Sequence, residues 1–399
     1  MSLAGKTVLI TGSTNGIGKE TAFQLAEKGA RIVMACRNVK LAQQVADEIH
    51  SRHPHATVVV GPPLDLRSMD SVHAFAQHYL EHDGPIHILI NNAGAFEADP
   101  YYTPEGVGGL CQVNYLGPFT LTRLLERRII QSAPSRIVTV SSVTHRFSSI
   151  GPPTTFLTNW KQGSNYGNSK LANVLFAFEM ERRMEQAGID NVHSCAVDPG
   201  AVASSIWNNQ SMFRKGPINW VIRNLYAPNE EGAKAVVHAA TVPWEVERQK
   251  AREISDAWNV SQRHDRSGED VRFYARGMFA WPTITSLRGR VLPPRERGLV
   301  EKARHWAYSL SALFHSMADW PVRQLSRGVL ASTTSPVPAA PLAYDAALAR
   351  ALWDVSCETA GVPRDITPFV VVDNAGGTRS GKVGRVNAVA GSGNDRKND

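Results

Sequence analysis

The apolar run Val8-Leu9-Ile10 leads directly into Thr11-Gly12-Ser13-Thr14-Asn15-Gly16-Ile17-Gly18, and a segment of helical periodicity follows. This order of buried strand, glycine turn and helix N-terminus is typical of a phosphate cradle, because backbone N–H groups and the helix dipole favour an anion. Gly12 permits the sharp turn, while Gly16 and Gly18 let the backbone approach a pyrophosphate closely. On its own, the Gly-x-x-x-Gly-x-Gly spacing fits a glycine turn without a ligand equally well.

The composition is that of a globular chain. Of its 399 residues, 43% are hydrophobic and 20% are charged, which argues against both wholesale disorder and a polytopic membrane protein. The four cysteines are scattered without metal-ligand spacing, so we expect no metal site and a reducing, cytoplasmic environment. We also expect no membrane span, since no segment approaches about eighteen uninterrupted apolar residues. The formal net charge of +7 is small for this length and indicates little about partners.

Short β-rich apolar runs alternate with longer segments of helical periodicity up to about residue 200, which predicts a parallel sheet. The expected strands are Thr7 to Thr11, Arg31 to Cys36, Thr57 to Val60, Ile86 to Asn91, Arg136 to Ser141 and His193 to Asp198. The helices between them are expected to begin near Ile17, Val39, Met69, Val107 and Ser164. Right-handed crossovers then give a doubly wound, Rossmann-type α/β fold, whose ligands bind at the carboxyl ends of the strands.

The sequence after the sixth strand predicts a lid at about 204–241, with a helix from Glu230 to Ala240, inside a catalytic domain of residues 1–285. Residues 286–340 are basic and then amphipathic, which predicts a helical insertion. A C-terminal helix at 341–362 is expected to pack on the catalytic domain, and the polar, glycine-rich tail 363–399 is expected to be largely disordered. The apolar face at about 299–320 suits a core-packed helix, a membrane-surface helix or a partner-binding element.

Tyr166 and Lys170 carry the clearest chemical signal in the sequence. They are four residues apart at the start of an expected helix, so both side chains project from one face. A phenol has a reference pKa of about 10, and a nearby ammonium moves that pKa toward the working range of a general acid or base. Of the nine tyrosines, only Tyr166 precedes a lysine by four residues. By itself the pair fits an exposed helix surface equally well.

Further polar residues are expected at the same edge of the sheet. Ser142 follows the fifth strand, where its hydroxyl can hold a carbonyl oxygen. Asn91-Asn92-Ala93-Gly94 ends the fourth strand, where Gly94 allows the backbone to approach a flat ring. Asn114 lies inside the next helix, where a buried asparagine lowers helix propensity and needs partners. We expect it to anchor a water near the lysine and so complete a proton path.

These motifs occur together in the order typical of classical short-chain dehydrogenases/reductases, and the chain resembles that family. The resemblance implies that a hydride moves between a nicotinamide ring and a carbonyl or carbinol carbon. It implies that Tyr166 is the acid/base, that Ser142 orients the substrate oxygen and that Lys170 binds the nicotinamide ribose. Asn114 would support the water relay. The remaining implied contacts, beside the carboxamide and phosphates, are Pro199, Gly200 and Ser204, of which Ser204 replaces the more usual threonine.

The end of the second strand bears on the choice of cofactor. A member that prefers NAD would carry an acidic residue at Cys36, whereas Arg37 offers a cation to a 2′-phosphate, so we expect NADP(H) rather than NAD(H). Asp65 matches the family's adenine contact, although a helix-capping aspartate is the alternative. The expected cofactor contacts are Gly12, Ser13, Asn15, Gly16, Ile17, Gly18, Arg37, Asp65, Leu66, Asn92, Ala93, Gly94, Tyr166, Lys170, Pro199, Gly200 and Ser204.

Two stretches, Tyr166-Gly-Asn-Ser-Lys-Leu-Ala-Asn-Val-Leu-Phe176 and Ala351-Leu-Trp-Asp-Val-Ser-Cys357, resemble the retinol dehydrogenase-like branch. The resemblance implies an NADP(H)-dependent oxidoreductase that interconverts a lipophilic alcohol and its aldehyde or ketone, such as a retinoid, steroid or polyprenoid. The alternatives are a broad-specificity reductase of small carbonyls and a non-catalytic NADPH-sensing scaffold. We expect a monomer or homodimer with peripheral membrane contact through about 299–320. The chain lacks a recognised nucleic-acid-binding motif, so we expect no nucleic acid partner.

Overall fold

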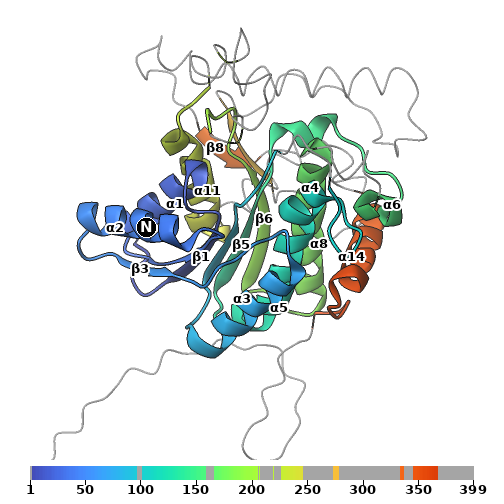
Figure 1. The fold of residues 1–399 in the computed structure, drawn as a ribbon, viewed down its shortest axis with the longest axis horizontal. Helices are drawn as coiled ribbons and strands as arrows, with labels where there is room; N and C mark the ends of the chain where they lie inside the picture. Colours follow the sequence, from blue (N-terminus) through green and yellow to red (C-terminus); the bar gives the residue numbers. More distant parts are fainter. Residues whose placement is uncertain are drawn as a thin grey trace, which may run out of the picture.

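The computed structural model describes residues 2–96, 101–158, 166–204, 206, 219, 226–245, 273–277, 333–336 and 345–366. Its centre is an eight-stranded sheet in the order β3-β2-β1-β4-β5-β6-β7-β8, with helices on both faces (Figure 1). The strands are β1 (Thr7–Thr11), β2 (Arg31–Ala35), β3 (Thr57–Val60), β4 (Ile88–Asn91), β5 (Ser135–Val140), β6 (Val192–Asp198), β7 (Phe273–Gly277) and β8 (Thr333–Pro336). Neighbouring strands are parallel except β7 and β8, which are antiparallel. The doubly wound parallel sheet expected from the sequence is confirmed.

The helices begin close to where the periodicity places them. They are α1 (Gly16–Glu27), α2 (Val39–Arg52), α3 (Met69–His82), α4 (Gly109–Cys111), the π-helical turn η1 (Gln112–Leu116), α5 (Gly117–Gln131), the 3-10 turn η2 (Val143–Phe147), α6 (Pro153–Thr158), α8 (Tyr166–Gln186), α11 (Asn229–Thr241) and α14 (Ala346–Ala360). Asn38 and Ser68 cap α2 and α3, since each side chain accepts a hydrogen bond from a backbone N–H of the first turn.

The core consists of two apolar layers, one on each face of the sheet. Successive residues of a strand point to opposite faces, so Leu9 packs with α3, α5 and α8, whereas Val8 and Ile10 pack with α1, α2 and α11. All three side chains are fully buried. The sheet is therefore covered on both faces, and its carboxyl edge is where the polar residues of the expected site come together.

Some parts of the chain differ from the sequence expectation or lie outside the described residues. β4 begins at Ile88 rather than Ile86, and the helix expected near Val107 begins at Gly109 with a π-helical turn. β7 was not expected, and within 286–340 the structure describes only β8. The rest of that expected insertion lies outside the described residues. So do most of 205–225 in the expected lid and residues 367–399 of the expected tail.

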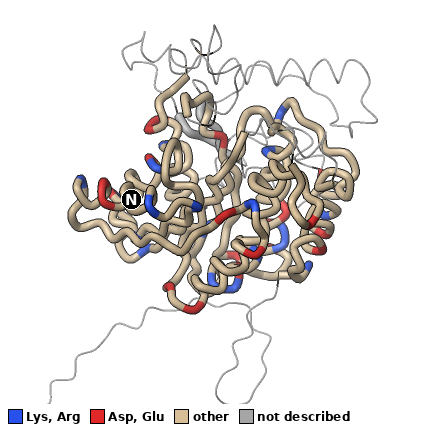
Figure 2. Tube along the Cα trace, in the orientation of Figure 1, with Lys and Arg blue, Asp and Glu red and all other residues tan. Residues whose placement is uncertain are grey.

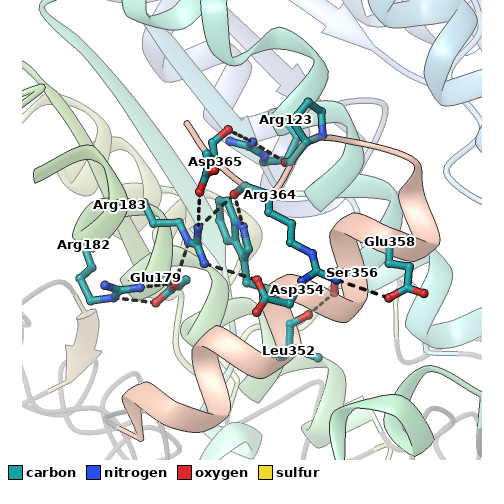
Figure 3. Close-up of polar contacts among 12 residues, drawn as sticks. Arg123, Glu179, Arg182, Arg183, Leu352, Asp354, Ser356, Glu358, Arg364 and Asp365 are labelled. Atoms are coloured by element: carbon teal, nitrogen blue, oxygen red, sulfur yellow. Dashed lines mark hydrogen bonds and ion pairs between the residues drawn. The ribbon is translucent and has the colours of Figure 1, made fainter. Parts of the chain in front are cut away.

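Helix α14 lies against α5, α6 and α8, although more than a hundred residues separate it from them in sequence (Figure 1). The guanidinium carbons of Arg123 and Arg183 lie 4.8 and 4.6 Å from the centroid of the Trp353 ring. Arg183 also donates to the carbonyl of Arg364 at 3.0 Å, as does the Trp353 indole at 2.8 Å. Figure 3 shows these arginines reaching the turn that follows α14. Cation–π contacts and charge-assisted hydrogen bonds thus fix the C-terminal helix to the catalytic helices.

A second contact joins α14 to the π-helical turn. The hydroxyls of Tyr115 and Ser356 are 2.9 Å apart, and both residues are buried. Burial raises the pKa of Tyr115, so its phenol stays protonated and can donate. Tyr115 directly follows Asn114, so α14 contacts the turn that carries one of the expected site residues.

Figure 2 shows basic and acidic residues interspersed along the described fold. Such a mixed distribution is typical of a chain whose net charge is small for its length. Of the helices within the described ranges, none combines the length and apolar character that crossing a bilayer requires.

We predict that Trp353→Ala lowers the free energy of unfolding by about 3–5 kcal/mol, the range for truncating a buried aromatic side chain. The loss follows from removing a ring that is 1% exposed and packs edge-on against Phe119 at 5.3 Å. Urea titration of the full chain measures the change. Leu80→Ala, at a side chain 37% exposed, is the control and should cost less than about 1 kcal/mol. Equal losses in the two variants would contradict the assigned role of α14.

Candidate functional site

A cavity of about 690 Å³ lies at the carboxyl ends of the central strands. It brings together every expected cofactor contact except Ser13, along with Ser142. Ser13 is fully buried instead, with its hydroxyl 3.3 Å from the Cys36 sulfur. Further wall residues, which no sequence motif marks, are Thr14, Asn38, Leu41, Leu64, Arg67, Ala95, Val113, Val140, Val202 and Ile206. Of these residues, Arg67 could have been predicted from the sequence, because it is a cation two residues after Asp65.

The glycine turn after β1 packs tightly against the turn after β4. Gly12 has a φ of +66°, and a Cβ there would lie 2.8 Å from the Cα of Ala93. A Cβ on Gly18 would collide with the Asn92 side chain and the Gly12 carbonyl. Any larger residue at either position must displace backbone, so the close approach itself requires glycine.

Hydrogen bonds hold these two turns together. The Asn92 amide donates to the carbonyls of Thr11 and Gly12 at 3.0 and 3.1 Å. In return, the Thr11 hydroxyl accepts from the backbone N–H groups of Asn92 and Ala93, both at 3.0 Å. Asn92 lines the cavity and also fixes the shape of the glycine turn.

The N-terminus of α1 suits an anion. Its cap residue, Asn15, makes no side-chain hydrogen bond to the first turn of the helix, and that turn carries no acidic residue. The helix dipole is therefore not neutralised by the described residues of α1 itself. Together with the two close-packed glycines, this end of α1 fits the pyrophosphate of a dinucleotide.

Tyr166, Ser142 and Lys170 meet at one end of the cavity. The Ser142 and Tyr166 side chains are hydrogen-bonded to each other, and the Lys170 ammonium lies 5.5 Å from the centroid of the Tyr166 ring. Lys170 is only 3% exposed and donates to the Val140 carbonyl at 3.0 Å. An ammonium has three donors, so this bond leaves donors for a ligand.

Burial controls the protonation of this group of residues. Tyr166 borders the cavity, but its phenol lies deep, and burial raises its pKa; the charge of Asp198 raises it further and the Ser142 hydrogen bond lowers it. Burial also lowers the pKa of Lys170 to about 8, opposed by Asp198. The phenol pKa therefore moves in the opposite direction to the one expected from the sequence. The Lys170 ammonium donates to the Val140 carbonyl, and the loss of hydration on burial disfavours the charged phenolate form of Tyr166.

Asn114 lies behind the cavity wall, in the π-helical turn. Its carboxamide oxygen accepts from the Ala95 N–H at 2.7 Å, and its amide donates to the Ala95 carbonyl and the Ser169 hydroxyl, both at 3.0 Å. Such turns often occur at functional sites because they change the direction of a side chain within a helix. Asn114 fixes the backbone beside Gly94 and links it to α8, while the expected water relay stays a prediction.

The adenosine end of the cavity contains the residues that bear on cofactor choice. Arg37 is exposed at the wall, whereas Cys36 is buried, and burial raises the pKa of its thiol. A carboxylate oxygen of Asp65 accepts from the Arg67 N–H at 3.0 Å in the turn before α3, whose cap is Ser68, so the contact of Asp65 with the adenine stays a prediction. The described residues contain no cluster of His, Cys, Asp and Glu that could hold a metal ion.

Comparison with known proteins gives a consistent result. The family model described as short chain dehydrogenase matches residues 6–215. Retinol dehydrogenases 11 and 12 from Homo sapiens are 38% and 39% identical to this chain over 246 and 247 residues, in matches that cover 60% of this chain and 74% of each relative. A crystal structure of an uncharacterised protein from Mycobacterium Paratuberculosis has a TM-score of 0.56 and 25% identity, covering 92% of this chain and 97% of that protein.

We predict that Gly12→Ala weakens dinucleotide binding more than tenfold, because the added methyl group displaces the Ala93 backbone and opens the cradle. Fluorescence titration with the reduced dinucleotide measures the dissociation constant. Gly188→Ala is the matched control, since Gly188 has a similar φ of +72° but open space around its Cβ position. It shares the backbone strain, about 1–2 kcal/mol, without the collision. Equal binding by the two variants would show that close approach at Gly12 is not required.

Proposed function

Because this chain belongs to the short-chain dehydrogenase family, in its retinol dehydrogenase-like branch, we propose that it is an NADP(H)-dependent enzyme for a lipophilic substrate. The family assignment establishes an oxidoreductase that acts on CH–OH and C=O groups. The proposed reaction interconverts a lipophilic alcohol and its aldehyde or ketone, with Tyr166 as the acid/base. The meeting of Ser142, Tyr166 and Lys170 at the glycine-cradle cavity carries the proposal.

Each residue of the site has its own role in the proposed reaction. When bound, the nicotinamide cofactor supplies or accepts the hydride at the substrate carbon. The Ser142 hydroxyl holds the substrate oxygen, and the Tyr166 hydroxyl gives that oxygen a proton during reduction or takes one during oxidation. The raised pKa of Tyr166 keeps its proton in place at neutral pH, which suits reduction. Lys170 would hold the nicotinamide ribose with the donors that Val140 leaves available.

Two cations support the preference for NADP(H). Arg37 and Arg67 both line the cavity near its adenosine end, and neither Cys36 nor Asn38 supplies the carboxylate that a ribose 2′-hydroxyl would need. A guanidinium can form two parallel hydrogen bonds to one phosphate, a bidentate geometry that a lysine ammonium lacks. The proposed 2′-phosphate contact is made by Arg37.

Apolar residues at or beside the cavity wall support a lipophilic substrate. Phe96 packs edge-on against the Tyr166 ring with a centroid distance of 5.0 Å, and Val113 and Ile206 line the cavity. The matched relatives are named for retinol, which agrees with this class of substrate. A small-carbonyl reductase is the rival function. It predicts that kcat/KM does not rise with the length of an aldehyde's alkyl chain, whereas the proposed function predicts a rise.

A non-catalytic NADPH sensor is the other rival function. A sensor has no use for a serine, a tyrosine and a buried lysine brought together beside the cofactor cavity, because burying the charged lysine is costly. The membrane-surface helix expected at about 299–320 lies outside the described residues and stays a prediction. The cytoplasmic location and the monomeric or homodimeric state likewise stay predictions from the sequence.

We predict that Tyr166→Phe lowers kcat for carbonyl reduction by about 10²- to 10⁴-fold, the range for loss of a general acid. The variant keeps the ring that packs against Phe96, so NADPH should bind within about threefold of the unmodified affinity. NADPH oxidation with a panel of aldehydes measures the turnover. Unchanged turnover would contradict the acid/base assignment, and binding without turnover by the unmodified chain would favour the sensor.

We predict that Arg37→Ala raises KM for NADPH at least tenfold and leaves KM for NADH within about twofold. A charge-assisted contact to a phosphate is worth about 1.5–3 kcal/mol, and NADH has no phosphate at that position. Lys40→Ala removes a cation from the exposed surface of α2 outside the cavity wall, so it controls for net charge. Equal effects on the two cofactors, or an equal effect of Lys40→Ala, would assign the preference elsewhere.

A further inference from the structure

The π-helical turn η1 lies between the cofactor cavity and the C-terminal helix α14. The Gly117 N–H donates to the Gln112 carbonyl five residues earlier, which is the hydrogen bond that defines a π-helical turn. Such turns are rare in proteins, so contacts with neighbouring elements have to hold one in place. Three residues of η1, namely Gln112, Asn114 and Tyr115, bond through their side chains to three other parts of the chain.

Two of these side chains reach the cavity wall and the first turn of α8. The Gln112 amide donates to the Leu66 carbonyl at 3.1 Å, and Leu66 lines the cavity. The Asn114 amide donates to the Ser169 hydroxyl at 3.0 Å, and Ser169 donates in turn to the Tyr166 carbonyl at 2.7 Å. Because a hydroxyl has a single proton, Ser169 can only accept from Asn114. Residues of η1 therefore hold the backbone of the proposed acid/base relative to the cavity wall.

The third side chain, that of Tyr115, reaches helix α14 instead. Its hydroxyl lies 2.9 Å from that of Ser356, although the two residues are 241 positions apart in the sequence. The Ser356 hydroxyl donates to the Leu352 carbonyl at 2.7 Å, so its oxygen accepts from Tyr115. Tyr115 is only 1% exposed and Ser356 is fully buried, so water does not replace this partner. Among the described residues, Ser356 is the acceptor on which the Tyr115 donor depends.

We propose that Tyr115 and Ser356 are positioning residues of the active site, whose hydrogen bond attaches η1 to α14 and thereby holds Asn114 against the first turn of α8. This inference rests on the proposed function. Helix α14 then does more than cover α5 and α8, because it holds the turn from which Asn114 reaches the segment that carries Tyr166. Neither Tyr115 nor Ser356 lines the cavity, so both act through Asn114.

Two single substitutions remove this hydrogen bond with different effects on stability. Tyr115→Phe deletes the donor, while Ser356 keeps its own bond to Leu352, so no buried hydroxyl is left without a partner. Ser356→Ala leaves the Tyr115 hydroxyl buried without an acceptor, which costs more stability. A displacement of about 1 Å at a reacting group can cost about 10²-fold in rate, so we expect kcat for carbonyl reduction to fall by about 10- to 100-fold in both variants.

The first measurement compares kcat with the midpoint of urea unfolding in the full chain. Tyr115→Phe, Ser356→Ala and the variant with both substitutions should share one loss of kcat, since each breaks the same bond, whereas Ser356→Ala alone should have the lowest midpoint. The dissociation constant for NADPH should stay within about threefold, because the glycine cradle is intact. Thr359→Ala is the matched control, since it removes an α14 hydroxyl that bonds to Val355 of the same helix, and it should leave kcat unchanged.

The second measurement needs neither cofactor nor turnover. Hydrogen exchange of the full chain, followed by mass spectrometry, reports how firmly the Gly117 N–H is held in η1. The peptide that spans residues 112–117 should exchange at least about tenfold faster in Tyr115→Phe, while peptides from β1 and β5 keep their rates. Thr359→Ala should leave all of these rates unchanged.

Two results would overturn the inference. One is a loss of kcat that follows the unfolding midpoint, with Tyr115→Phe as active as the unmodified chain, because stability then explains the loss. The other is unchanged exchange at residues 112–117 in Tyr115→Phe, which carries the test even if Ser356→Ala does not fold. Turnover that survives Tyr166→Phe overturns the proposed function instead, while the exchange measurement still tests whether α14 holds η1.

Discussion

The contact between the glycine turn after β1 and the Asn92 turn after β4 is the constraint on which the site depends. The two backbones approach so closely that Gly12 and Gly18 have no room for a side chain. Asn92 and Thr11 tie them together with four hydrogen bonds of 3.0–3.1 Å. Because parallel strands end at the same edge of the sheet, fixing these turns fixes the floor of the cavity. The catalytic groups are arranged around that floor.

The second feature that the structure adds is a low-dielectric end to the cavity. Lys170 is nearly excluded from solvent there, so burial lowers its pKa, and its ammonium donates to the Val140 carbonyl. The same exclusion keeps the proton on Tyr166. The protonation of Tyr166 and Lys170 is therefore governed mainly by loss of hydration, and no single neighbour of the tyrosine explains it.

Strong local signals made most of the fold predictable from the sequence. β1, β2 and β3 are runs of β-branched and apolar residues, and Gly12, Gly16 and Gly18 mark the turn that follows β1. β7 and β8 have no such signal, since Phe273–Gly277 ends in arginine and glycine and Thr333–Pro336 contains serine and proline. These strands join the sheet by pairing with β6 and with each other, a long-range contact that no local pattern encodes.

The residues of the site also differ in whether a local sequence pattern predicts them. Motif residues such as Tyr166 and Lys170 were predictable because their chemistry depends on spacing within one helix. The Ser13 hydroxyl lies against Cys36, which directly follows β2, and the contact of Ser13 with the cofactor stays a prediction. Asp198 looks like an ordinary turn residue at a strand end until its burial is known.

The direct test of the assigned chemistry is a crystal structure with NADPH and an unreactive carbonyl ligand. We expect the carbonyl oxygen within about 2.6–3.2 Å of both the Tyr166 and Ser142 hydroxyls. A dinucleotide bound away from Tyr166 would contradict the assigned chemistry.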